Sequence, residues 1–235
     1  LYRGESVDRP AVYSRTGFPR DDPTYDRLKA LLRNHSEQKA GWGSNHLETP
    51  YPTTIESEPH SQDWDRRLTT IHTPGQDLTA SHLLSRHGLP GLHERYFIDS
   101  PAKAEAWLSL PLPELSGDVD GFFQADEEIG DAGIAEVTLG YNPAGFVAEA
   151  CGSETFAILS LTYRDLVHAL CEREQQRLLR RVDWLLARSV GPFYSILGQE
   201  YLVPPLHGPA DFDEFNVCYD RPILDRIHEA GGRVH

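Results

Sequence analysis

The stretch GQEYLVPPLHGPADFDEFNVCYDRPILDRIHEAGGRVH, from Gly198 to His235, decides the fold class. Immediately before it, the short apolar run PFYSIL from Pro192 to Leu197 is typical of a buried strand. Within it, Pro209 opens a helix, because proline is favoured at the first helical position. The segment from Gly232 to His235 indicates a further strand. A strand, a helix and a second strand in this order predict a βα unit on a parallel sheet.

The preceding chain repeats this alternation. Two segments bounded by glycine are strand-like, GFFQA at 121–125 and GIAEVTL at 133–139. A long helix is expected from about Tyr163 to Ser189, with Thr162 and Asp165 placed to cap its start. Its apolar stripe consists of Leu166, Leu170, Leu178, Val182 and Leu185.

Repeated βα units fit either a doubly wound sheet or a (β/α)8 barrel. No GxGxxG or GxxxxGK motif follows any predicted strand, so a nucleotide-binding doubly wound sheet loses support. We therefore predict an α/β fold of the (β/α)8 TIM barrel type.

The first part of the chain has a different character. A helix is expected around Tyr25 to Leu32, a loop at 40–60, and a β-hairpin at 65–85 with a Thr-Pro-Gly turn. Ser100 and Pro101 open a further helix that runs to about Ser109. Residues 1–115 are therefore interpreted as an N-terminal extension packed on the barrel, and residues 116–235 as the first part of the barrel domain.

Composition restricts the class of partner. With 39% hydrophobic residues in 235, the chain can form a sizeable core, and no apolar run approaches the roughly 20 residues that span a bilayer. The formal charge of −14 repels phosphate backbones, which argues against nucleic acid as a partner. Cys151, Cys171 and Cys218 form no CxxC pair, and we expect small buried side chains in a reducing compartment, the cytoplasm.

Side chains at the ends of parallel strands are the candidates for chemistry, because the βα loops of such folds converge there. Glu200 and Tyr201 follow the strand PFYSIL, and His235 ends the last strand. Asn142 follows GIAEVTL, and Asp126 follows the GFFQA segment. Each also has a structural interpretation: a capping or ion-paired carboxylate for the acids, and packing for the aromatic rings and the histidine.

Three segments resemble the uroporphyrinogen decarboxylase superfamily, which also contains corrinoid-linked methyltransferases acting on thiols. They are ILGQEY at 196–201, PPLHGPADFDEF at 204–215 and CYDRPILDRIHEAGGRVH at 218–235, and LGYNPAGF at 139–146 fits the family's Gly-Pro element. The resemblance covers about Gly121 to His235. It implies a (β/α)8 barrel of which this chain would contain the extension and roughly the first half to five-eighths.

The chain departs from the decarboxylase pattern near its start. That pattern is RQAGRY, whose two arginines hold the carboxylates of a tetrapyrrole, whereas Val12 to Phe18 reads VYSRTGF and keeps only Arg15. The methyltransferase branch instead uses zinc to hold the accepting thiol as a thiolate, and His235 matches its first ligand position. The other ligands would lie outside residues 1–235.

The resemblance therefore favours methyl transfer that involves a corrinoid or a zinc-activated thiol. Two alternatives stay open: tetrapyrrole decarboxylation in porphyrin biosynthesis, which needs no cofactor, and a non-catalytic corrinoid- or tetrapyrrole-binding barrel. Expected catalytic residues are Glu200, Tyr201 and His235, and expected substrate-binding residues are Arg15, Asp126, Asn142 and Tyr219. Expected partners are a small-molecule substrate, a corrinoid protein and a second copy in a homodimer, without nucleic acid or membrane.

Overall fold

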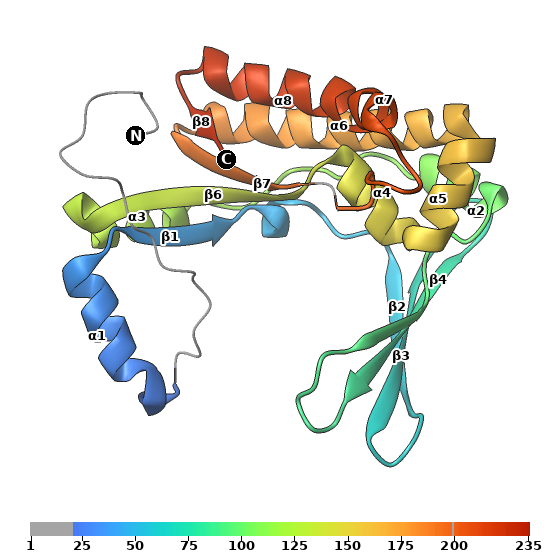
Figure 1. Ribbon diagram of the computed structural model, residues 1–235, viewed down its shortest axis with the longest axis horizontal. Coiled ribbons are helices and arrows are strands. Elements are labelled where there is room, and N and C mark those ends of the chain that lie inside the picture. Colours follow the sequence, from blue (N-terminus) through green and yellow to red (C-terminus); the bar gives the residue numbers. More distant parts are fainter. Residues whose placement is uncertain (1–20, 199) are drawn as a thin grey trace.

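The computed structural model describes residues 21–198 and 200–235. These residues form two separate sheets, one parallel and one antiparallel, each of four strands (Figure 1). The parallel sheet has the order β1-β6-β7-β8, and its outer strands β1 and β8 do not pair with each other. The prediction of a TIM barrel is therefore wrong, because the strands form an open sheet and do not close into a ring.

The parallel sheet consists of β1 (Gln38–Gly43), β6 (Gly133–Tyr141), β7 (Phe193–Leu197) and β8 (Arg233–Val234). The antiparallel sheet consists of β2 (Thr53–Pro59), β3 (Trp64–Ile71), β4 (Leu78–Ser85) and β5 (Leu92–Arg95). The α-helices are α1 (Asp26–His35), α2 (Pro101–Leu108), α3 (Asp120–Ile129), α4 (Pro143–Cys151), α5 (Ser153–Thr162), α6 (Arg164–Leu186), α7 (Pro209–Phe212) and α8 (Cys218–Glu229). Short 3-10 turns lie at Pro23–Tyr25, Asn45–Leu47 and Gly130–Ala132, and a π-helical turn at Asp213–Val217 joins α7 to α8.

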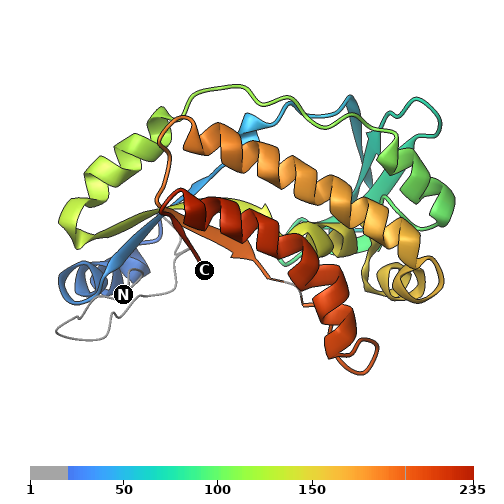
Figure 2. The same cartoon turned by 90° about the horizontal axis from the view of Figure 1, so that it is seen from above.

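One face of the parallel sheet is covered by helices. In both views α6 and α8 lie side by side along this sheet, and α3 packs against β1 and β6 (Figures 1 and 2). The expected stripe of α6 is confirmed, since Leu178, Val182 and Leu185 are fully buried against Val137 and Tyr194 of the sheet. Burial of apolar side chains on both partners stabilises this layer by roughly 25 cal/mol per Å².

A second core lies beyond the carboxyl edge of the parallel sheet. It gathers side chains from α2, α4, α5, the first half of α6 and the base of the antiparallel sheet, among them Leu78, Trp107, Phe156 and Phe215. The far end of the antiparallel sheet projects away from the body as an arm (Figure 1). All seven residues of β2 are exposed, so the arm contributes little to either core.

Several predicted elements are confirmed and several are corrected. The hairpin, the helices at 26–35 and 101–108, and the strands at 133–141 and 193–197 are present. The GFFQA segment at 121–125 is not a strand but lies within α3. The expected loop at 40–60 contains β2 and part of β1, and β1 belongs to the parallel sheet, although its residues were assigned to the extension. Thr162 does not cap α6, whose N-cap residue Tyr163 makes no side-chain capping hydrogen bond.

Within the described part of the chain, no helix combines the length and the apolar character needed to span a membrane. The three cysteines are free thiols. Cys151 and Cys171 are buried as expected, whereas Cys218 is exposed, so the expectation is wrong for that residue. Burial raises the pKa of the Cys151 thiol to about 12, which keeps it protonated at neutral pH.

Candidate ligand-binding site

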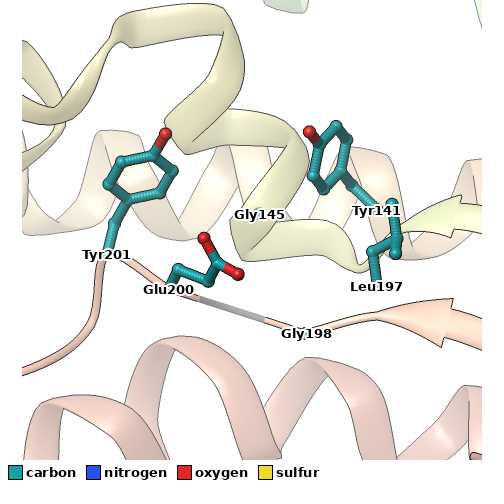
Figure 3. Close-up of a pocket in the computed structure, with 6 residues that line it drawn as sticks. All are labelled: Tyr141, Gly145, Leu197, Gly198, Glu200 and Tyr201. Atoms are coloured by element: carbon teal, nitrogen blue, oxygen red, sulfur yellow. The ribbon is translucent and has the colours of Figure 1, made fainter. Parts of the chain in front are cut away.

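A cavity of about 190 Å³ lies where β6 and β7 end. We call it the Glu200 pocket, and its described lining residues are Tyr141, Gly145, Leu197, Gly198, Glu200 and Tyr201 (Figure 3). The carboxyl ends of parallel strands are the usual place for ligands in open α/β sheets. The structure therefore brings together two of the predicted catalytic residues, Glu200 and Tyr201, at the expected edge of the sheet.

The pairing of β6 with β7 sets the position of the pocket. Tyr141 is the register partner of Leu197, and the backbone N–H of Asn142 donates to the Leu197 carbonyl at 3.1 Å. Both strands therefore end at the same level. Gly198, Glu200 and Tyr201 consequently lie beside the first turn of α4, which follows β6 (Figure 3).

Asn142 and Pro143 fix the start of α4. The Asn142 side-chain oxygen accepts a hydrogen bond from the Gly145 backbone N–H at 2.8 Å, and Pro143 occupies the first helical position. A Cβ at position 145 would lie 2.7 Å from the Asn142 Oδ1 atom, closer than such atoms approach. Glycine is therefore needed at 145, and it leaves the helix backbone open to the pocket.

The loop after β7 is held in place by two buried side chains. Leu202 is buried in the second core, and His207 is buried beside α5. The His207 ring lies 2.8 Å from the Ser160 hydroxyl through Nε2 and 3.2 Å from the Tyr201 carbonyl oxygen through Nδ1. These contacts position Glu200 and Tyr201 although both side chains are exposed.

The pocket has a negative electrostatic environment. Burial, together with the carboxylates of Glu149 and Glu200, raises the pKa of the Tyr141 hydroxyl. Burial also raises the pKa of the Tyr201 hydroxyl, followed by the effects of Glu149, Tyr96, Tyr141 and Glu200. Both tyrosines are therefore protonated hydrogen-bond donors at neutral pH.

These groups allow two kinds of chemistry. Glu200 lies in a partly enclosed site. Its carboxyl group can accept a proton from a bound ligand or donate one to it. The hydroxyl groups of Tyr141 and Tyr201 can donate hydrogen bonds to the same ligand, and their rings can pack against apolar or cationic groups. None of the six lining residues is Lys or Arg.

His235 lies outside this pocket. Its Nδ1 atom is 3.0 Å from a Glu136 carboxylate oxygen, and its Nε2 atom is 3.0 Å from the Lys39 ammonium nitrogen. Lys39 and Glu136 are themselves paired at 2.7 Å. A Lys side chain at the second ring nitrogen does not fit a zinc ligand. Among residues 21–198 and 200–235, no three His, Cys, Asp or Glu side chains are grouped to hold a metal. The zinc site predicted at His235 has no ligand set among these residues.

The other predicted binding residues have different surroundings. Asn142 is fully buried, and its amide group donates to Asn216 at 2.6 Å and to Asp220 at 2.9 Å. Tyr219 is buried in α8 with its hydroxyl 2.7 Å from His168 Nδ1. Asp126 is exposed on α3, before β6 begins, and so lies away from the carboxyl edge. Arg15 lies outside the described residues.

Four lining residues of the pocket were not predicted as site residues: Tyr141, Gly145, Leu197 and Gly198. Glu149, which lies near both pocket tyrosines, was not predicted either. The signal for Tyr141 was present, since it directly follows the strand-like segment GIAEVTLG. Gly145 and Glu149 belong to α4, a helix that was not predicted, and they lie one helical turn apart on the same face.

Comparison with known proteins gives no match: no family model, no curated protein and no solved structure matches the chain. The fold and the pocket therefore define the chain as an α/β protein with a carboxylate-bearing pocket at the carboxyl edge of an open parallel sheet. The resemblance to the uroporphyrinogen decarboxylase superfamily rests on the quoted motifs.

Proposed function

We propose that the chain is an enzyme that acts on a small molecule in the Glu200 pocket, and that Glu200 exchanges a proton with that molecule. The observation that carries the proposal is the meeting of Glu200, Tyr141 and Tyr201 around one cavity at the carboxyl edge of the sheet (Figure 3). Positioned carboxylates with neighbouring hydroxyl donors are typical of general acid–base sites.

The reaction class we propose is methyl transfer to a thiol, in line with the sequence resemblance. The thiol proton passes to the Glu200 carboxylate while the sulfur forms its bond to the methyl carbon. The electron pair of the broken bond stays with the methyl donor. Because a free thiol is a weaker acid than glutamate by about 4 pK units, we expect the proton to move during bond formation and not before it.

Decarboxylation of a tetrapyrrole is the weaker candidate. Recognition of several carboxylates needs cations in paired geometry, and the six described lining residues include none. A corrinoid would supply the methyl carrier in the related methyltransferases, but a cavity of 190 Å³ is below the roughly 300–1,000 Å³ of pockets that enclose drug-sized ligands. A complete corrinoid therefore does not fit inside it, and we assign no step to one.

The free cysteines agree with a reducing cytoplasm as the location.

The test is methyl transfer with the purified protein. We expect that a panel of methyl donors, comprising sulfonium, quaternary ammonium and methylcorrinoid compounds, yields methylated thiol detectable by mass spectrometry. Glu200→Gln should lower the rate by about 10²- to 10⁴-fold, because the lost group is an acid or base, while the melting temperature changes little.

Glu154→Gln is the matched control, since Glu154 is an exposed glutamate on α5 outside the Glu200 pocket. Equal rates for Glu200→Gln and wild type would refute the proposed role of Glu200. Conversion of uroporphyrinogen to coproporphyrinogen without any thiol methylation would assign the protein to the decarboxylase alternative.

A further inference from the structure

The Glu200 pocket combines aromatic rings with unbalanced negative charge. Glu200 forms no ion pair with any described residue, and Glu149 lies on α4 one turn beyond Gly145, near both pocket tyrosines. Glu149 lies close to His93, whose Nε2 atom is 3.7 Å from a Glu149 carboxylate oxygen. Even with His93 protonated, the carboxylate of Glu200 stays without a counter-charge among the described residues.

The two tyrosine rings stand on opposite sides of this carboxylate. Figure 3 shows Tyr141 and Tyr201 flanking the space beside Gly145, with the Glu200 carboxylate between them. The faces of aromatic rings carry negative potential and attract cations within about 6 Å. A third tyrosine, Tyr96, contributes to the raised pKa of the Tyr201 hydroxyl. The Tyr96 ring stacks in parallel on the His93 ring, with 5.0 Å between the ring centroids.

The dipole of helix α4 opposes this negative charge. The amino end of α4 reaches the pocket at Gly145, and a helix amino end carries about half a positive charge. It is already capped by the Asn142 side chain. Two full carboxylate charges, on Glu149 and Glu200, outweigh this half charge, so the net potential in the pocket is negative.

We propose that the Glu200 pocket binds a small organic cation bearing methyl groups, a quaternary ammonium or a sulfonium, between the rings of Tyr141 and Tyr201 with Glu200 as its counter-charge. The cavity of 190 Å³ equals about six water volumes of ~30 Å³, which suits a head group of this size. The inference rests on the proposed function in one respect: this cation is the methyl donor of that reaction.

The charge of such a donor also favours release of the product. When the methyl group leaves for the thiol sulfur, the electron pair of the broken bond neutralises the onium centre. The product then lacks the charge that held the substrate beside Glu200 and between the rings. Substrate binding is therefore favoured over product binding in the same pocket.

Binding of three isosteric probes tests the ligand class independently of turnover. The probes are choline, its neutral analogue 3,3-dimethylbutan-1-ol and the anionic 3,3-dimethylbutanoate, each titrated into the full chain by calorimetry or NMR. All three share a head with three methyl groups. Choline differs from the alcohol only in the charged nitrogen that replaces the central carbon, and the butanoate carries a carboxylate in place of the hydroxymethyl group. We expect choline to bind about tenfold or more tighter than the alcohol, corresponding to about 1.4 kcal/mol, and the anion to bind weakest.

Variants separate the contributing groups. Glu200→Gln should reduce choline affinity about tenfold and leave the affinity for the alcohol unchanged, and Glu149→Gln should act in the same direction with a smaller effect. Glu154→Gln, the exposed control, should change neither. Equal affinity for choline and the alcohol, no choline binding, or unchanged choline affinity in both pocket variants would each overturn the inference. A methyl transfer rate that still depends on Glu200 would then leave the proposed function standing.

Discussion

Glu200 and Asp220 are carboxylates with opposite surroundings. Glu200 is exposed in the pocket, whereas Asp220 is partly buried in α8, where its Oδ2 atom accepts from Asn142 and Asn216, each at 2.9 Å. The Oδ1 atom of Asp220 is buried and has no hydrogen-bond partner. Burial raises the pKa of the Asp220 carboxyl, although both amide donors lower it. Asp220 therefore braces the start of α4 at a cost to stability, and Glu200 is the carboxylate available for chemistry.

We predict that Asp220→Asn stabilises the protein at neutral pH. Because the folded pKa of Asp220 lies above the unfolded value of 3.8, the unfolded chain loses this proton first as the pH rises. The contribution of Asp220 to the free energy of unfolding is therefore complete below pH 3.8 and falls as the pH rises through the folded pKa. Asparagine has no proton to lose, and its oxygen can still accept from the two amides.

Urea denaturation between pH 4 and pH 8 measures this difference. The stability of Asp220→Asn relative to wild type should increase with pH and then level off. Asp225→Asn, at an exposed position on the same helix, should show no such trend. A variant that is less stable than wild type at pH 8 by the same amount as at pH 4 would contradict the account.

The buried ion pairs of α6 connect this helix to Glu48, in the segment that follows β1. Arg181 is completely buried, and its Nη2 atom donates to a Glu48 carboxylate oxygen at 2.6 Å. The other Glu48 oxygen accepts from Arg177 Nη1 at 2.7 Å. Arg181 also donates to the Leu139 carbonyl of β6 at 3.0 Å. These contacts tie α6 to β6 and to the segment that follows β1.

Glu48→Gln should destabilise the protein by about 3–5 kcal/mol, because it leaves a buried arginine without its counter-charge. The free energy of unfolding from chemical denaturation measures the effect. Asp183→Asn is the matched control, since Asp183 and Arg226 form an ion pair with half-exposed side chains on α6 and α8, and its loss should cost less than about 1 kcal/mol. Similar values for the two variants would show that burial does not decide the strength of these pairs.

The helices and strands differ in how far local sequence predicts them. The α6 stripe and the segments that became β6 and β7 have strong periodicity or clear glycine boundaries, and they were predicted. The α3 helix was missed for two reasons. The five residues GFFQA are too few to distinguish the periodicity of a strand from that of a helix. In addition, the last turn of α3 contains the acidic residues Asp126 to Glu128, whose charge interacts unfavourably with the helix dipole. Tertiary packing of Phe122 in the core overrides that disadvantage.

The arrangement of the whole sheet was not predictable in the same way. Parallel strands in sequential order arise equally in an open sheet and in a barrel, so local patterns of βα units leave closure undetermined. Two of the predicted catalytic residues meet because they follow the same strand, β7. His235 ends a neighbouring strand, yet it contacts Glu136 and Lys39, a pairing across three strands that no local spacing indicates.

The net charge of the whole molecule is negative, like the charge of the pocket, and it also favours a cationic ligand. A formal charge of −14 attracts cations and repels anions over the entire surface, which favours encounter with a cationic ligand. The surface field alone would bind a cation diffusely. The proposed site is instead one defined position, between Tyr141 and Tyr201.

The most direct measurement is a crystal of the full chain soaked with tetramethylarsonium, a heavy-atom analogue of a quaternary ammonium, with anomalous data collected at the arsenic edge. The account predicts an arsenic peak between the rings of Tyr141 and Tyr201 and beside the Glu200 carboxylate, and the loss of that peak in Glu200→Gln crystals. Arsenic found only at surface carboxylates elsewhere, with the Glu200 pocket empty of anomalous density, would contradict it.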